Sequence, residues 1–300
     1  MFTDILLAAT PSEVNQWAAQ AAFALARKHQ ARICLLHVCG PPVYGWSDIE
    51  YLNPSGELDR VKARIEESCR DQYQETDKLT VEVVAGLPHE EILRFSRKKN
   101  IDLIVMGSRE KSRPERRPTT WGMTGTTMEM VSQRAHCPVM IVSRPVAKES
   151  LTFSNLVMAT DFSDQSECAL GYAGQLSRHY KAKLFVVHVL DVGSQYERLK
   201  VYQEDIEKLI EEAKGRIARE FEPMLRGVNH QLEVWEGVPY VEILKVARRE
   251  KADLILMAHH AKNKDPEKAF LGSTVAQVAI RSACPTVSVN KHFDVRCAVY

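Results

Sequence analysis

The sequence lacks the features that mark membrane, secreted and metal-binding proteins. No stretch is long and apolar enough to cross a bilayer. The first nine residues carry no basic leader, so we expect a first strand there rather than a signal peptide. The seven cysteines are odd in number and form no C-x-x-C pair, which favours reduced thiols in the cytoplasm over a disulfide framework or a zinc site. With a net charge of +1, nothing calls for nucleic acid or a membrane as partner.

Signatures of hydrolytic enzymes are also missing. The chain contains no G-x-S-x-G elbow and no H-E-x-x-H helix, and no carboxylate pair or lysine is placed to hold magnesium and a γ-phosphate. The pair His259-His260 suggests metal or phosphate contact, but no cysteine or acidic residue lies at the usual ligand spacing. We therefore predict neither catalytic residues nor a metal site.

The sequence does contain an internal repeat. Asp102-Leu103-Ile104 returns 151 residues later as Asp253-Leu254-Ile255, and Cys137-Pro138 returns 147 residues later as Cys284-Pro285. Matches in one order and at a nearly constant offset indicate a duplicated unit. The predicted domains are residues 1–145 and 152–292.

Each copy contains five short apolar runs separated by helical patterns. An apolar run without alternation is typical of a strand buried on both faces of a parallel sheet. The fold class predicted is α/β, with two tandem doubly wound five-stranded parallel-sheet domains. The predicted strands are Asp4–Ala9, Arg32–Val38, Thr80–Ala85, Asp102–Gly107 and Cys137–Val142, then Leu156–Ala159, Lys183–Val189, Gln231–Glu236, Asp253–Ala258 and Cys284–Val289.

Such a sheet predicts where a ligand would bind. Ligands of doubly wound sheets bind at the carboxyl ends of the strands, where the winding direction reverses. With the first strand central, this crevice lies between the first and fourth strands of each copy. A Gly-Ser/Thr pair then precedes a helix, at Gly125-Thr126 and at Gly272-Ser273. Its N–H groups, its hydroxyl and the helix dipole favour phosphate, although an ordinary N-cap has the same pattern.

The whole chain resembles the universal stress protein family. The resemblance is carried by D-L-I-V-M-G-S at Asp102–Ser108, by the later Gly-Ser/Thr pair, and by C-P-V at Cys137–Val139, and it extends over both copies. It implies an adenine nucleotide alpha hydrolase-like fold and a cytoplasmic role in stress response. It also implies ATP or AMP as ligand in many members, with Mg only where ATP is bound. Because members pair through the last strand, we expect an internal pseudo-dimer of the two copies, and further a homodimer.

The second copy resembles the nucleotide-binding motif of that family more closely. It keeps the acidic residue, Asp161, and the Gly272-Ser273 pair, but Ala258 and Ala261 replace the two leading glycines. The resemblance implies that Asp161 meets the ribose or an adenine edge, that the backbone at Val189 meets the base, and that the helix start takes phosphate. The predicted nucleotide-binding residues are Thr160, Asp161, Val189, Met257, Ala258, His259, Ala261, Gly272, Ser273 and Thr274.

The first copy departs further from the motif. Glu110 stands at the second glycine and Pro11 at the acidic position, and the glycine-to-glycine spacing is longer. A carboxylate at Glu110 would repel a polyphosphate, so this crevice is the weaker candidate. Its predicted residues are Thr10, Val38, Met106, Gly107, Gly125, Thr126 and Thr127.

Three functions stay open, in decreasing order of support. The first is a stress-response regulatory protein that binds ATP or another adenine nucleotide, mainly in the second copy. The alternative is an interaction scaffold with degenerate crevices and unknown protein partners. A slow ATPase is disfavoured, because no residues are placed for phosphoryl transfer.

Overall fold

The protein is described by a computed structural model, which covers residues 1–10, 13–40, 56–71, 78–108, 127–146, 151–191, 203–258 and 273–290. Among these residues, no helix combines the length and the apolar character that crossing a membrane requires.

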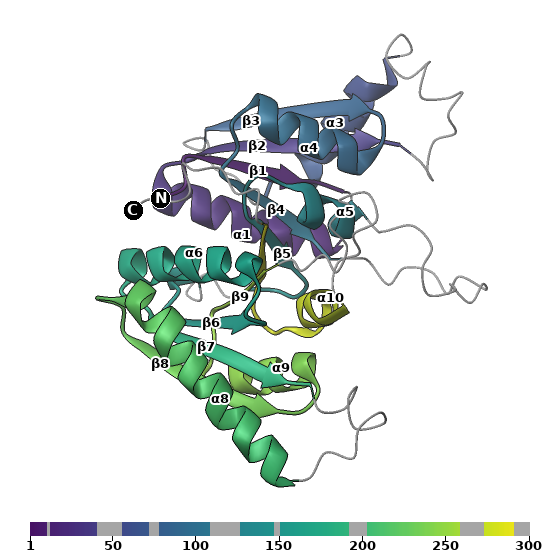
Figure 1. Cartoon of the computed structure of the whole chain (residues 1–300). Helices are drawn as coiled ribbons and strands as arrows, with labels where there is room; N and C mark the ends of the chain where they lie inside the picture. The colour runs from purple at the N-terminus through teal and green to yellow at the C-terminus, as the bar shows by residue number, and fades with distance from the viewer. Residues whose placement is uncertain are drawn as a thin grey trace, which may run out of the picture.

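A single mixed sheet runs through the molecule, in the order β3-β2-β1-β4-β5-β10-β9-β6-β7-β8 (Figure 1). All neighbouring strands are parallel except β5 and β10, which pair antiparallel at the centre. The sheet therefore consists of two five-stranded parallel halves joined at their last strands. The strands are β1 Asp4–Ala8, β2 Arg32–Cys39, β3 Leu79–Ala85, β4 Leu103–Gly107, β5 Val139–Val142, β6 Asn155–Thr160, β7 Lys183–Leu190, β8 His230–Glu236, β9 Leu254–Ala258 and β10 Thr286–Val289.

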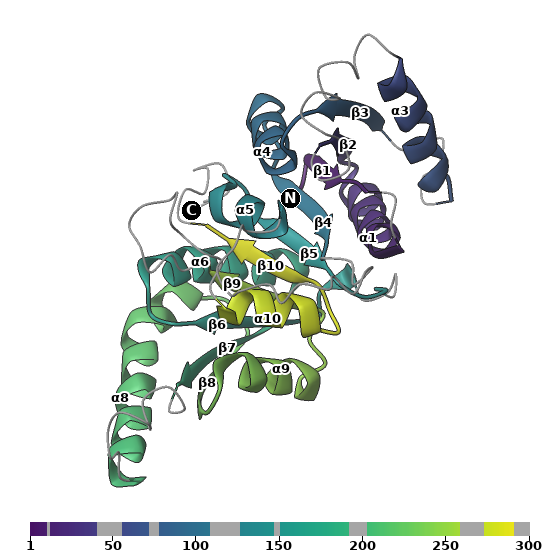
Figure 2. The same ribbon diagram turned by 90° about the vertical axis from the view of Figure 1, so that its right-hand side faces the viewer.

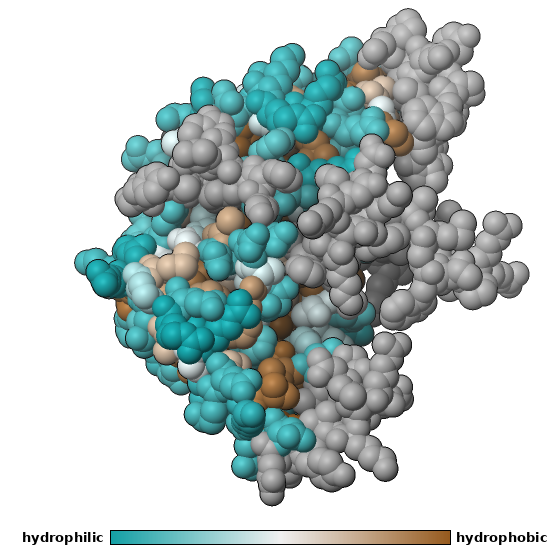
Figure 3. Space-filling model, viewed as in Figure 1, coloured by the Kyte–Doolittle hydropathy of each residue, from teal (hydrophilic) through white to brown (hydrophobic). Residues whose placement is uncertain are grey.

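Helices cover both faces of this sheet. Alternate residues of each strand enter different cores: Ile5 and Leu7 of β1 pack with α1, α3, α6 and α8, whereas Leu6 and Ala8 pack with α4, α5, α9 and α10. The outer face of α8 is mainly hydrophilic (Figure 3). The helices are α1 Glu13–His29, α3 Glu57–Ser68, α4 Pro88–Lys98, α5 Thr127–Arg134, α6 Asp164–Tyr180, α8 Gln203–Phe221, α9 Pro239–Arg249 and α10 Ser273–Arg281, with a short 3-10 helix at Glu222–Leu225.

The seam between the halves has approximate two-fold symmetry. Met140 of β5 pairs with Val287 of β10, and these two residues occupy equivalent positions in the repeat. Both are almost completely buried. Beyond the strands, Ser143 Oγ donates to the Ala279 carbonyl (2.5 Å), and the Asn290 amide donates to the Gln133 carbonyl. Each half thus hydrogen-bonds to the fourth helix of the other, α5 or α10 (Figure 2).

The ends of α1 and α6 also meet across this axis. His29 Nε2 lies 2.5 Å from the Tyr180 hydroxyl, and the two residues are 151 positions apart, which is the offset of the repeat. Phe2 packs edge-on against His29, and Phe153 packs in the same way against Tyr180. The seam is therefore built from equivalent residues of the two copies.

The repeated aspartate stabilises the amino-terminal ends of the strands. Asp102 accepts hydrogen bonds from the Thr3 and Asp4 amides, and Asp253 accepts the equivalent bonds from Ser154 and Asn155. Burial raises the pKa of Asp102 above its ordinary value, although these donors oppose the shift. The pattern that revealed the duplication thus joins the fourth strand to the first in each half.

The predicted fold class is confirmed. The strands lie within one or two residues of their predicted positions, and the last strands pair as the resemblance implies. The sequence did not predict the 3-10 helix or that the ten strands would form one continuous sheet. Continuity arises because edge strands β5 and β10 satisfy each other's backbone groups.

Candidate functional site

The crevice of the second half lies above the neighbouring strands β6 and β9. Ala159 of β6 aligns with Met257 of β9, so Asp161 follows β6 beside the carboxyl end of β9 at Ala258. The chain continues from β6 to β7 and β8 on one side, and returns to β9 on the other. This is the switch point at which doubly wound sheets bind ligands.

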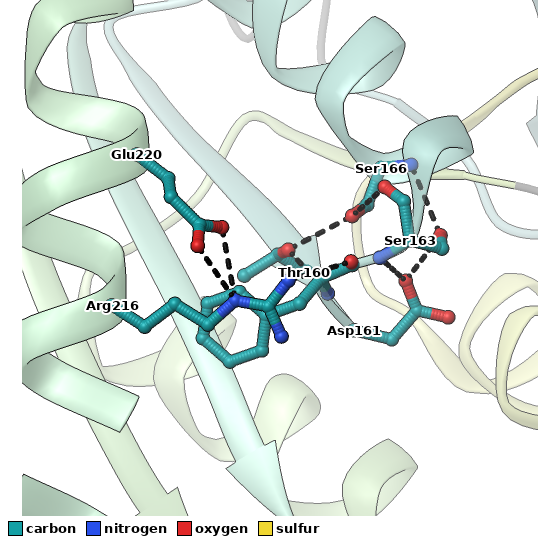
Figure 4. A network of polar contacts seen from close by, with 7 residues as sticks. Thr160, Asp161, Ser163, Ser166, Arg216 and Glu220 are labelled. Atoms are coloured by element: carbon teal, nitrogen blue, oxygen red, sulfur yellow. Dashed lines mark hydrogen bonds and ion pairs between the residues drawn. The ribbon is translucent and has the colours of Figure 1, made fainter. Parts of the chain in front are cut away.

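The Asp161 carboxylate is held in a fixed turn at this point (Figure 4). Its Oδ1 accepts from the Ser163 hydroxyl at 2.6 Å and from the Ser163 amide at 3.1 Å. The Ser163 hydroxyl in turn accepts from the Ser166 amide, which caps the N-terminus of α6. Asp161 is exposed, so the turn presents a carboxylate at the mouth of the crevice.

The hydroxyl and carbonyl of Thr160 are already engaged by other groups of the protein. Its hydroxyl, which is buried, lies 3.0 Å from the Ser166 hydroxyl and accepts from the Phe162 amide at 3.1 Å. Its carbonyl lies 2.9 Å from His188 Nδ1. Of the predicted pair Thr160 and Asp161, the aspartate is therefore the better placed to meet a ligand.

The helix whose N-terminus is predicted to hold phosphate is α10. It begins at Ser273 and runs alongside β10. Strand β10 is parallel to β9, so the N-terminus of α10 faces the carboxyl end of the sheet. Its positive dipole end would favour an anion there. Thr274 is partly exposed in the first turn of the helix.

The structure brings only part of the predicted second-half set together. Asp161, Met257 and Ala258 lie at adjoining strand ends, whereas Val189 lies one strand further on β7 and pairs with Trp235 of β8. Met257 is almost completely buried, which leaves its backbone rather than its side chain to line the crevice. His259, Ala261, Gly272 and the side chain of Ser273 lie outside the described residues.

The first-half crevice has the same strand arrangement. Ala8 of β1 aligns with Met106 of β4, and Gly107, which ends β4, is partly exposed. Thr10 is exposed after β1, and Thr127 begins α5. Val38 lies near the end of β2 and is partly buried. The positions at Pro11, Glu110, Gly125 and Thr126 lie outside the described residues.

Two equivalent histidines contact the backbone next to these crevices. His37 Nδ1 lies 2.8 Å from the Ala9 carbonyl, as His188 does from the Thr160 carbonyl. Burial lowers the pKa of both imidazoles, so they are neutral at pH 7 and their Nδ1–H groups donate. Both histidines are therefore structural parts of the repeated unit.

Two residues that sequence reasoning missed enclose the Asp161 turn. The Phe162 ring lies 4.3 Å from the His188 ring, and the Arg216 guanidinium lies 4.4 Å above Phe162. Arg216 belongs to α8 and is also bound by Glu220. Phe162 adjoins Asp161 in the sequence, but no pattern marks Arg216, because it is one of several charges on an amphipathic helix.

Metal binding finds no support within the part of the chain that the structure describes. No cluster of three or more His, Cys, Asp or Glu side chains there could hold a metal ion. The paired histidines at 259 and 260 lie outside it.

The fold and the crevices define a class of protein: duplicated α/β units whose parallel strands leave a ligand crevice at each switch point. The family model described as the universal stress protein family matches residues 1–143 and again residues 152–290. The chain belongs to the universal stress protein family, with two copies of the family domain.

Individual relatives agree with this assignment. A universal stress protein of Methanocaldococcus jannaschii is 32% identical over 155 residues, which cover 48% of this chain and 84% of that protein. One of Bacillus subtilis is 31% identical over 153 residues, which cover 47% of this chain and 99% of that protein. A solved universal stress protein of Archaeoglobus fulgidus covers 96% of both chains with a TM-score of 0.63 and 23% identity, which shows a shared fold.

Proposed function

We propose that this protein is a regulatory binding protein whose second-half crevice takes an adenine nucleotide. The observation that carries the proposal is the Asp161 carboxylate, exposed and fixed by Ser163 beside the end of β9. A carboxylate held in this way is an acceptor for a pair of ribose hydroxyls or for an exocyclic amine. The N-terminus of α10 would attract the phosphate.

The roles proposed for the remaining residues follow from their places in the fold. The backbone at the end of β7, near Val189, would meet the base, and the backbone of Met257 and Ala258 would line the sugar. Thr274 and the α10 amides would receive phosphate oxygens, and Mg would accompany only a polyphosphate such as ATP. No step of this proposal requires catalysis.

The test is a titration of the whole chain with ATP and with AMP, followed by isothermal calorimetry. Asp161→Ala should weaken binding by about 10- to 100-fold, as expected for the loss of a charged hydrogen-bond acceptor. Glu167→Ala, which removes an exposed carboxylate one turn along α6, should leave binding unchanged. Absence of heat and of thermal stabilisation at millimolar ATP would exclude the proposal.

A scaffold function is the second candidate, and a specific surface favours it. An open groove of about 420 Å³ runs along α9, away from the crevice, between Tyr240 and Arg249. Nearby, the apolar side chains of Trp235 and Val238 are 39% and 45% exposed. Loss of binding to a captured protein on Val238→Asp, with nucleotide binding absent, would favour this candidate.

A further inference from the structure

Side chains of β7 and α8 contact Phe162 in the turn that carries Asp161. The His188 ring of β7 lies 4.3 Å from the Phe162 ring and is tilted by 42°, and the Arg216 guanidinium of α8 lies over the ring at 4.4 Å. Phe221 packs at the side of Phe162 at 5.7 Å. Figure 4 shows Arg216 and Glu220 reaching from α8 toward the turn.

Phe162 is held in a conformation that its side chain disfavours. Its φ is 60°, in the left-handed region where a non-glycine residue is strained. Such strain persists only where the surroundings determine the backbone. This backbone places the Ser163 amide and hydroxyl on Asp161 Oδ1.

Arg216 contacts both this loop and its own helix. Its Nη2 donates to the Phe162 carbonyl at 3.4 Å, and its Nε donates to Glu220 at 2.9–3.0 Å. The ion pair with Glu220 therefore holds the guanidinium over the ring. Lysine could not replace this contact fully, because its point charge cannot bind Glu220 and the Phe162 carbonyl with two fixed N–H groups at once.

The geometry points to Arg216 and Phe162 as positioning residues: by stacking on one another they lock the turn in which Asp161 meets a nucleotide. The inference rests on the proposed function and adds to it that α8 controls ligand affinity. Displacement of Arg216 from Phe162 would release the strained backbone and let the Asp161 carboxylate turn away.

We call the contact of Arg216 with Phe162 the lock. The described residues of the first half contain no equivalent contact. Arg64 of α3 lies near His37, where its charge contributes to lowering the imidazole pKa after burial, but its guanidinium pairs with Glu57 at 3.8 Å. Pro11 stands where the second half has Asp161. The lock and the carboxylate therefore occur together in the second half.

The experiment measures ATP affinity for the full chain and four variants. Arg216→Ala should weaken binding about tenfold, and Arg216→Lys should recover little of it. Arg219→Ala, which removes an exposed arginine from the same helix, is the matched control and should bind normally. Phe162→Gly keeps the left-handed backbone accessible without the ring, so it should also weaken binding.

A double-mutant cycle separates positioning from general destabilisation. If Arg216 acts through Asp161, adding Arg216→Ala to Asp161→Ala should weaken ATP binding no further. Full additivity of the two changes would overturn the inference. Equal thermal stability of Arg216→Ala and Arg219→Ala would show that the affinity loss is not unfolding.

Amide hydrogen exchange tests the lock without a ligand. In Arg216→Ala the Phe162 and Ser163 amides should exchange at least tenfold faster than in the native protein, whereas amides of β7 should not change. Unchanged exchange at Phe162 and Ser163 would refute the lock whatever the affinities. If native protein binds no nucleotide but exchange rises as expected, the proposed function fails and the lock stands as a structural device without its ligand role.

Discussion

The two halves share one backbone plan and differ where a ligand would bind. In both halves the repeated aspartate accepts hydrogen bonds from the residues at the start of the first strand, and a partly buried histidine lies within 3 Å of the carbonyl that follows or ends that strand. Only the second half combines Asp161 with a stacked aromatic ring. Duplication thus preserved the residues that join strands, while the residues around the crevices diverged.

The halves also differ in how the second strand ends. In the first half Gly40 follows β2 and passes close to the turn after β3: a Cβ built on it would lie 2.0 Å from the Gly86 carbonyl oxygen. In the second half Asp191 follows β7 at the equivalent place. The two segments are hydrogen-bonded in both halves, Gly86 to Cys39 and Gly237 to Leu190, so what distinguishes the first half is the lack of space for a side chain at Gly40.

The largest effect is expected where this close approach is disturbed. Gly40→Ala should lower the free energy of unfolding by about 2–3 kcal/mol, because the new methyl group meets backbone that cannot move aside. Urea denaturation measures it. As a control, Gly171→Ala within α6 meets no atom within 4 Å and should stabilise by about 0.5–1 kcal/mol. Equal effects of the two changes would contradict the asymmetry.

An intermediate effect is expected from pH at the seam. Burial, and then the charges of the N-terminus, His179 and Lys28, lower the pKa of His29 to about 4, whereas its partner Tyr180 does not titrate in this range. The unfolded state takes up the proton near pH 6.5, so His29 destabilises the fold progressively as pH falls from 6.5 to 4 and has little effect above that range.

A comparison of His29→Gln with the native protein isolates this contribution. Because His29 is half-exposed, native protein should lose only about 1 kcal/mol more than the variant between pH 7 and pH 5. Urea unfolding at the two pH values measures the difference. The same loss in both proteins would show that the other buried histidines or the carboxylates cause it.

An effect of similar size, about 1 kcal/mol, is expected from a buried polar residue at the seam. Thr286 of β10 is fully buried, and its hydroxyl has no hydrogen-bond partner within the described structure, whereas Val139 occupies the equivalent place in β5. Thr286→Val should therefore stabilise by about 1 kcal/mol. Thr160→Val, which removes a hydrogen-bonded hydroxyl, should lower the free energy of unfolding by a similar amount. Urea unfolding of the two variants and the native protein measures both changes. Destabilisation by Thr286→Val would indicate a bound water.

Much of the fold could be predicted from the sequence because the signals are local. Runs such as Leu254–Ala258 have no alternation, which predicts strands covered on both faces, and the pairs that recur at an offset near 150 predict the duplication. The domain limits 1–145 and 152–292 stay predictions. The site was predicted less completely, because contacts such as Arg216 with Phe162 depend on the direction that a helix takes over the sheet.

Several predicted nucleotide-binding residues also stay predictions, since they lie outside the described residues: His259, Ala261, Gly272, Gly125 and Thr126. Thr160 illustrates a different limit. Its place at the end of a strand predicted a ligand contact, but its hydroxyl and carbonyl are both engaged inside the protein. Position in a motif identifies the neighbourhood of a site, while side-chain direction decides which residue faces it.

Order along the chain determined the parallel strands, the two copies and the crevice position in each, since burial pattern and chain connectivity leave few other arrangements. The pairing of β5 with β10 was expected from the family resemblance, but only the tertiary structure decided that His29 meets Tyr180 where the two-fold axis passes. It alone also brought an arginine of α8 over the ring beside Asp161. Those contacts join residues far apart in the sequence, and no local preference specifies such a pairing.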